Sequence, residues 1–169
     1  GSYDGFLYAL SANSGKLLWK FHSIGDAYFP NGEFQEAPAL YNNTLYVGSR
    51  DYNIYALDAN TGRGKWNMKE RGSWIIATPF QHNKLLYFGT SDSHSFYCMD
   101  AEYGEIKWKL PLNMRVYGSA VFANRLIWFG CFNGKLYGVD RLTGAINKVF
   151  QTESSREKYA TVYDSSGTF

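Results

Sequence analysis

The residues that could do chemistry in this chain are few and widely spaced. Its histidines, His22, His82 and His94, lack the spacing of metal ligands, which predicts solvated loop positions. Its cysteines, Cys98 and Cys131, are 33 residues apart and form no disulfide framework. Packing is the expected role of Cys98, and pairing of the two thiols stays open. No Gly-x-Ser-x-Gly elbow, phosphate-binding loop or dinucleotide fingerprint is present.

Carboxylates recur at regular positions, which at first suggests a repeated catalytic or metal-binding acid. One series is Asp58, Asp100 and Asp140, each four residues before a glycine. Asp at such a place typically accepts hydrogen bonds from turn amides. A structural role in the turn is therefore favoured over a catalytic or metal-binding role. A second series lies in other turns and is expected to act in the same way: Asp4, Asp51, Asp92 and Asn133. A calcium site would need several more oxygens converging on one of them.

Composition favours a β-rich globular protein. The chain has 169 residues, 18% of them aromatic, and a net charge of +2. That charge is too small to indicate nucleic acid or an acidic membrane surface as a partner. No run of about 18 apolar residues is present, so no membrane span is expected, and the N-terminus shows no signal peptide.

One phrase recurs four times with substitutions, on the pattern Asp, two residues, Thr-Gly, three residues, Trp, which residues 58–66 match in full. Its glycines, Gly15, Gly62, Gly104 and Gly144, are separated by 47, 42 and 40 residues. A period in this range indicates a repeat architecture. The whole chain, 1–169, divides into repeat units of approximately 1–47, 48–88, 89–129 and 130–169.

Each repeat contains four runs that alternate as strands do. In one repeat they are 75–80, 84–89, 95–100 and 106–110. Across the repeats, the runs are joined by turns that contain Asn, Asp-Gly or Asn-Gly, and Thr-Gly. Four antiparallel strands per repeat predict an all-β protein, a β-propeller of about four blade equivalents. The chain opens at a hairpin between the second and third strands of a blade. We expect it to end with a first strand at Tyr159–Tyr163 and the start of a second strand at Thr168-Phe169.

The segment 56–66, Ala-Leu-Asp-Ala-Asn-Thr-Gly-Arg-Gly-Lys-Trp, resembles the tryptophan-docking motif of PQQ-like (quinoprotein-type) β-propellers. The resemblance covers all four repeats. It implies that each motif tryptophan stacks between a small residue of its own blade and the turn glycine of the next. Carried over to this chain, the docking residues are Trp19, Trp66, Trp108, Gly15, Gly62, Gly104 and Gly144.

The fourth repeat departs from this pattern, because Lys148 stands where a tryptophan is expected. Two arrangements follow from the incomplete end blades. The ends complete one blade and close a small ring, or the chain is a segment of a larger ring, for which the resemblance implies eight blades. Open edge strands would also allow two copies to associate as a homodimer. The lysine favours the open segment.

The resemblance implies two kinds of function. The family includes quinone-dependent dehydrogenases and non-enzymatic, BamB-like members. The dehydrogenases use an adjacent Cys-Cys pair, calcium ligands and an Asp base, none of which can be matched here. We therefore expect a non-catalytic binding or scaffold module without cofactor, in the periplasm or at the cell surface. PQQ and calcium belong only to the alternative, a fragment of a PQQ-dependent alcohol or sugar dehydrogenase. A third reading is a sensor or accessory domain of a larger protein.

Binding is expected at the rim, in the loops that connect successive blades. Aromatic and Arg side chains are frequent there, as they are in binding hot spots. We expect these loops to meet a protein partner or small ligand, unless their aromatic residues merely pack around the central axis. The candidate rim residues are Tyr28, Phe29, Glu36, Arg71, Trp74, Arg115, Tyr117, Lys158 and Tyr159.

Overall fold

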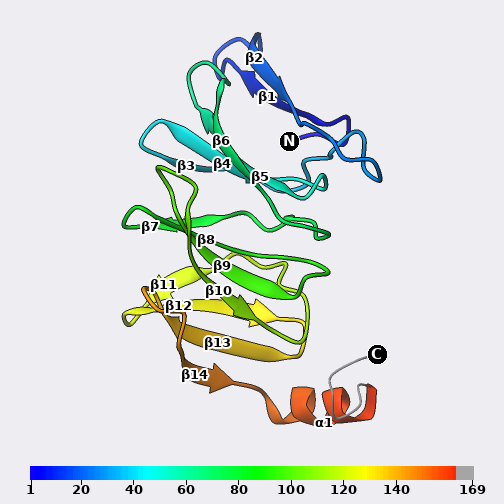
Figure 1. Cartoon of the computed structure of the whole chain (residues 1–169), viewed down its shortest axis with the longest axis vertical. Helices are drawn as coiled ribbons and strands as arrows, with labels where there is room; N and C mark the ends of the chain where they lie inside the picture. The colour runs from blue at the N-terminus through cyan, green and yellow to red at the C-terminus, as the bar shows by residue number, and fades with distance from the viewer. Residues whose placement is uncertain (163–169) are drawn as a thin grey trace.

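The protein is described here by a computed structural model that covers the backbone of residues 1–162 and the side chains of residues 1–157. Fourteen strands form four antiparallel sheets within this part of the chain, stacked one after another (Figure 1). The first sheet has two strands and the others have four each. The strands are β1 (Phe6–Leu10) and β2 (Leu17–His22); β3 (Ala39–Tyr41), β4 (Thr44–Gly48), β5 (Asn53–Asp58) and β6 (Gly64–Lys69); β7 (Phe80–His82), β8 (Leu85–Gly89), β9 (Ser95–Asp100) and β10 (Ile106–Pro111); β11 (Val121–Ala123), β12 (Leu126–Cys131), β13 (Lys135–Asp140) and β14 (Ile146–Phe150).

Each four-stranded sheet is a propeller blade in which sequence neighbours pair in order. The hairpins between first and second strands turn through two residues with positive φ, such as Asn42 (44°) and Asn43 (56°), or Asn83 (49°) and Lys84 (64°). Positive φ at both positions is the requirement of the two-residue turns that match strand twist. The predicted all-β propeller is therefore confirmed.

The first strand of the third blade is shorter and starts later than predicted. In the third blade we expected 75–80, but the strand is β7 at Phe80–His82. The residues before it form a connection whose backbone is held by the preceding blade, since the Ile75 amide donates to the Ser49 carbonyl at 3.2 Å. Apolar alternation in 75–80 reflects burial of Ile75 and Ala77, not pairing in a sheet.

The predicted strand at Tyr159–Tyr163 is wrong for the residues that the structure describes. These residues continue the helix α1 (Glu153–Val162), while Tyr163 and the expected strand start at Thr168-Phe169 lie outside the described residues. The helix starts because the Thr152 hydroxyl accepts the Ser155 amide at 3.1 Å, and Glu153 occupies the first turn. The place of Tyr159–Tyr163 in the repeat order predicted a strand, but the local start signal at Thr152 gives a helix.

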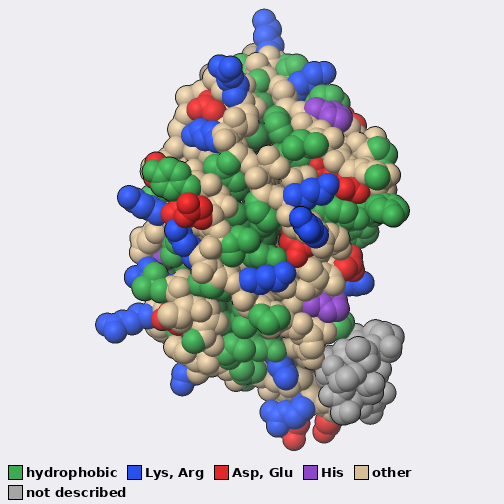
Figure 2. Space-filling model, in the orientation of Figure 1, with side chains coloured by type: hydrophobic (Ala, Val, Ile, Leu, Met, Phe, Trp, Pro, Cys, Tyr) green, Lys and Arg blue, Asp and Glu red, His purple; other side chains and the backbone are tan. Residues whose placement is uncertain are grey.

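The sheets form an open arc. The sheet β1–β2 and the last sheet lie at opposite ends of the stack, so this chain does not close a four-bladed ring (Figure 1). Three buried clusters hold the arc together, one at each junction between successive sheets. Figure 2 shows apolar side chains along the middle of one face, with no continuous basic patch on that face. No helix in the described part is long and apolar enough to cross a membrane.

Candidate functional site

A repeated indole contact fixes each blade against the next. The rings of Trp19, Trp66 and Trp108 lie over the turn glycines Gly62, Gly104 and Gly144 of the following blade. A β-carbon built on these glycines would come within 2.5, 2.8 and 2.8 Å of the indoles. Each indole N–H also donates to a carbonyl in that blade, at 3.0 to 3.2 Å. The indoles are half-buried, not fully enclosed.

A tyrosine adds a second donor at two of these junctions, which the sequence analysis missed. Tyr46 donates to the Ala101 carbonyl at 2.9 Å, the same acceptor that Trp66 uses. Tyr87 and Trp108 share the Arg141 carbonyl in the same way. The junctions are therefore rigid, and they hold the connecting loops in fixed positions along both sides of the arc.

The connections between blades and the hairpins between second and third strands lie on one side of the arc, which we call the rim face. Both come to this side because the first and third strands of a blade start there (Figure 1). Backbone hydrogen bonds join them: the amides of Arg50, Ser91 and Phe132 donate to carbonyls of Glu33, Trp74 and Arg115. The rim face thus includes hairpin residues that we did not consider as candidates.

An aromatic cluster with one arginine lies on the rim face between the first three sheets. We call it the Trp74 cluster. The Phe29 ring meets Trp74 edge-on with centroids 5.1 Å apart, and meets Tyr52 at 5.7 Å. The Arg50 guanidinium lies 4.4 Å from the centre of the Trp74 ring and 5.7 Å from that of Tyr3. The cluster consists of Tyr3, Phe29, Arg50, Tyr52 and Trp74.

Arg50 is oriented within this cluster by a chain of hydrogen bonds. Its Nε donates to Gln35 at 2.8 Å, and the Gln35 amide donates to the Tyr3 hydroxyl at 2.6 Å. Its two terminal nitrogens make no hydrogen bond with any residue that the structure describes. A stacked, oriented guanidinium with free donors is suited to a planar acceptor such as a carboxylate.

The loop that carries Phe29 is tied down by a buried acid. Asp51 accepts the Tyr55 hydroxyl and the Gly25 amide, and the Tyr55 oxygen accepts the Ile24 amide at 2.9 Å. Burial, reinforced by the hydrogen bond to Asp51, raises the pKa of Tyr55 far above its ordinary value. The phenol therefore stays protonated and keeps the longest connection in place.

The other rim candidates fall into separate groups. Tyr117 bonds to Ser91 at 2.8 Å and meets Phe132 edge-on at 4.9 Å, and Arg115 pairs with Asp92 at 3.0 Å. Tyr28, Glu36 and Arg71 are exposed, with Tyr28 82% accessible. Lys158 and Tyr159 lie in α1, and the structure does not describe their side chains.

Sequence reasoning missed Arg50, Tyr52 and Tyr3. The alternating direction of the strands could have identified these residues. It places the hairpin between the second and third strands of every blade beside the connections between blades.

The turn carboxylates are engaged with backbone, as the Asx reading predicted. Asp58 Oδ1 accepts the amides of Asn60 and Thr61, and Asp140 Oδ1 accepts those of Leu142 and Thr143. Donation by the Thr61 hydroxyl is the largest cause that lowers the pKa of Asp58. Within the described residues no group of three His, Cys, Asp or Glu side chains converges.

His82 is not a solvated loop residue. Its ring stacks on Phe122 of the next blade, with centroids 3.9 Å apart. The two cysteines are free and buried in one core cluster.

Comparison with known proteins gives the family. A family described as outer membrane protein assembly factor BamB matches residues 3–168. The chain belongs to this family. BamB of Shewanella oneidensis is 26% identical over 161 residues, which cover 92% of this chain and 40% of that protein. The tetrathionate hydrolase of Acidithiobacillus ferrooxidans is 33% identical over 110 residues, covering 64% of this chain and 20% of the relative. The quinoprotein alcohol dehydrogenase PedH of Pseudomonas putida is 29% identical, covering 66% and 20%.

Solved structures agree on the fold. BamB from Moraxella catarrhalis superposes with a TM-score of 0.72 at 18% identity, covering 89% of this chain and 44% of that chain. The quinohemoprotein alcohol dehydrogenase ADHIIG from Pseudomonas putida HK5 gives 0.74 at 17% identity, covering 89% and 32%. The chain thus has the PQQ-like propeller fold, and it spans less than half the length of these relatives.

Proposed function

We propose that this chain is a non-catalytic propeller module that binds a protein partner through the Trp74 cluster, in the periplasm or at the cell surface. The observation that carries the proposal is the stacking of Arg50 on Trp74, flanked by Tyr3 and Phe29. Trp, Tyr and Arg dominate protein-binding hot spots. Membership of a family described as an outer membrane protein assembly factor supports a scaffold role.

The cluster combines half-buried side chains with an exposed neighbour, as a preorganised interface requires. Phe29, Trp74 and Arg50 are half-buried, so their rotamers are already restricted before a partner arrives. Tyr28, beside Phe29, is fully available for contact. A partner with an apolar side chain and a neighbouring carboxylate would match both the rings and the free guanidinium nitrogens.

Site-specific crosslinking tests this function. A photoreactive residue at Tyr28 should give one discrete crosslinked species in intact envelopes, and Arg50→Gln should remove it. The same residue at Tyr103, which is exposed on the opposite side of the arc, is the matched control. Equal crosslinking from both positions, or a species that survives both Arg50→Gln and Trp74→Ala, would contradict the proposal.

The alternative is part of a quinoprotein dehydrogenase, and the similarity to PedH favours it. Quinone-dependent turnover is the direct test of catalysis by this chain. Protein supplied with pyrroloquinoline quinone and calcium should not reduce a dye with alcohols or sugars. Quinone-dependent turnover would reject the non-catalytic proposal.

A further inference from the structure

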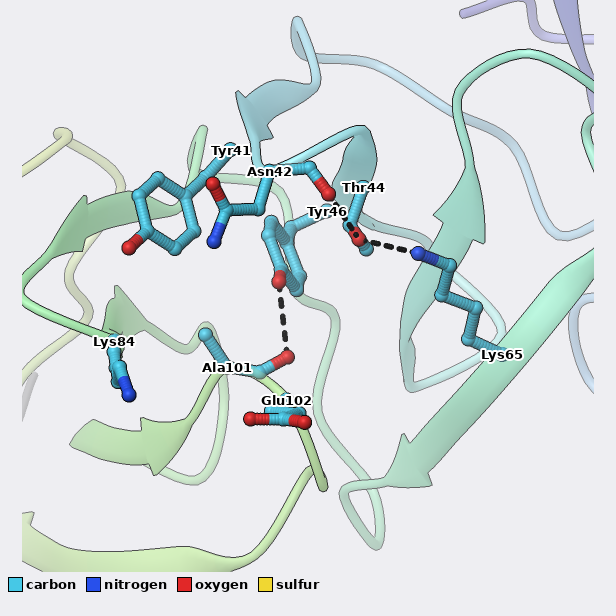
Figure 3. A pocket seen from close by; sticks show the side chains of 8 residues that line it. All are labelled: Tyr41, Asn42, Thr44, Tyr46, Lys65, Lys84, Ala101 and Glu102. Atoms are coloured by element: carbon cyan, nitrogen blue, oxygen red, sulfur yellow. Dashed lines mark hydrogen bonds between the residues drawn. The ribbon is translucent and has the colours of Figure 1, made fainter.

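A polar cavity of about 280 Å³ opens between the second and third sheets, on the side opposite the rim face. Its walls come from the hairpin β3–β4, from β6, and from two turns of the third blade (Figure 3). Lys65 and Lys84 reach it from opposite sides in that view. Two lysines and one carboxylate, Glu102, line this small cavity, so it has an excess of positive charge that attracts an anion.

The floor of the cavity is rigid and its polar atoms are oriented. Thr44 is buried, its hydroxyl bonds to the Asn42 carbonyl, and it accepts Lys65 Nζ at 2.7 Å. Tyr46, also buried, donates to the Ala101 carbonyl at 2.9 Å. This hydrogen bond directs Lys65 Nζ, on an exposed side chain, to the cavity wall and leaves two of its three N–H donors free.

The second lysine is also anchored, but only through its backbone. The Lys84 carbonyl accepts the Ala101 amide at 2.9 Å, and its φ of 64° belongs to the tight hairpin turn. Neither Lys84 Nζ nor the Asn42 side-chain amide forms a hydrogen bond or ion pair with any residue that the structure describes. These donors line the cavity without a protein partner.

Other groups at the cavity suit hydroxyls and a ring. Tyr41 offers an aromatic side chain and a phenol, and Glu102 adds one carboxylate to the wall. A carboxylate accepts hydrogen bonds and repels bare anions, so it favours a ligand that carries hydroxyl donors as well as its charge.

The next junction lacks this arrangement. At the corresponding place between the third and fourth sheets, His82 stacks on Phe122. Leu85 and Leu142 stand there in place of Thr44 and Glu102. The Thr44 and Glu102 side chains of the cavity are thus specific to this junction, whereas basic residues recur at the next one, as Lys107 and Arg125.

We infer that this cavity binds a small hydroxylated oxyanion, a sugar acid or sugar phosphate, with Lys65 and Lys84 holding the anionic group and Glu102 accepting hydroxyls. The two lysines meet the anionic oxygens, Asn42 donates a further hydrogen bond, and Tyr41 lies beside the ring. This site is separate from the Trp74 cluster, so the inference does not depend on the proposed protein partner.

The test is titration of the protein by calorimetry and by amide NMR with four probes: glucuronate, glucose 6-phosphate, glucose and inorganic phosphate. The two charged sugars should bind saturably and at least fivefold more tightly than glucose or phosphate, with shifts at residues 41–44, 84 and 101–102. A preference between the two charged sugars identifies carboxylate or phosphate as the favoured group.

Two variants locate the site. Lys84→Asn and Lys65→Gln should each weaken binding at least fivefold. Asn suits the turn position of Lys84, because Asn43 fills it one blade earlier with the same positive φ. The matched control is Arg125→Asn, since Arg125 occupies the same turn position in the next blade, with a φ of 67°. Its affinity should stay within twofold of the original.

Three results would overturn the inference. They are unchanged affinity in Lys84→Asn, an equal loss in Arg125→Asn, and the absence of saturable binding by either charged sugar. Inorganic phosphate binding as tightly as the sugars would reject recognition of the hydroxyls. Thermal unfolding of each variant checks that the fold is retained.

Discussion

Trp66 lies so close to Gly104 that a β-carbon on the glycine would come within 2.8 Å of the indole. The glycine also has a φ of 72°, which disfavours any side chain. Steric fit and backbone conformation therefore both require glycine at this junction. The same relationship joins Trp19 to Gly62 and Trp108 to Gly144.

The first prediction separates the two requirements. Gly104→Ala should lower the free energy of unfolding by about 2–4 kcal/mol, because the methyl group meets the indole and the backbone is strained. Gly15→Ala is the matched control, with a φ of 68° and no atom within 4 Å of the added carbon. It should cost about 1 kcal/mol, from the backbone alone. Urea unfolding measures both, and equal losses would show that the indole contact contributes nothing.

The second prediction concerns the indole itself. Trp66→Ala should cost about 3 kcal/mol, because it removes a large ring and leaves the Ala101 carbonyl with one donor fewer. Lys148→Ala, at the same motif position in the last blade, should change stability by less than about 0.5 kcal/mol, since Lys148 is exposed. Chemical denaturation compares them. A similar cost for both would refute the special role of the indole.

The sequence could predict these contacts because they repeat. A glycine with positive φ, a tryptophan four residues later and a fixed period leave few alternative folds. The Trp74 cluster does not repeat: Arg50 and Tyr52 come from the β4–β5 hairpin of the second sheet, whereas Tyr3 precedes the first sheet and Trp74 lies in the connection to the third, so only the three-dimensional arc brings them together. The helix α1 lies where the repeat pattern predicted a strand at Tyr159–Tyr163. Its start depends on one local signal, the hydroxyl of Thr152.

The third prediction is loss of stability in alkali. Burial raises the pKa values of Tyr55 and Tyr87 above the ordinary value of 10.0. Above pH 10 the unfolded chain releases these protons while the folded chain retains them, so the free energy of unfolding falls as pH rises. Tyr55→Phe should make this fall less steep. The exposed Tyr28→Phe should leave its slope unchanged, as urea unfolding at pH 9 to 11 would show.

The fourth prediction is that both thiols are unreactive in the folded protein. Cys98 is 0% and Cys131 7% exposed, and burial raises the pKa of Cys98 to about 12. A thiol reagent at pH 8 attacks the thiolate, which is scarce at both sites. Labelling should require unfolding, so its rate should rise with the denaturant concentration as the unfolded fraction grows. Rapid labelling of the native protein would contradict this burial.

The last prediction tests whether Tyr52 is retained for binding at a cost to stability. Tyr52 has a φ of 72°, whereas the corresponding turn positions hold Gly5 and Gly134, with φ of 83° and 76°. A bulky residue in this conformation costs about 1 kcal/mol or more, and such strain persists mainly at functional sites. Tyr52→Gly relieves the strain but removes the ring that packs against Phe29 at 5.7 Å.

Stability and binding should therefore respond differently to Tyr52→Gly. The free energy of unfolding should stay within about 1 kcal/mol of the original, because relief of strain offsets the lost aromatic contact. Crosslinking from Tyr28 should fall severalfold, because Phe29 and Trp74 lose a supporting ring. Tyr52→Phe keeps the ring and the strain, so it should retain both properties. A large loss of stability with unchanged crosslinking would show that Tyr52 serves the fold and not the binding surface.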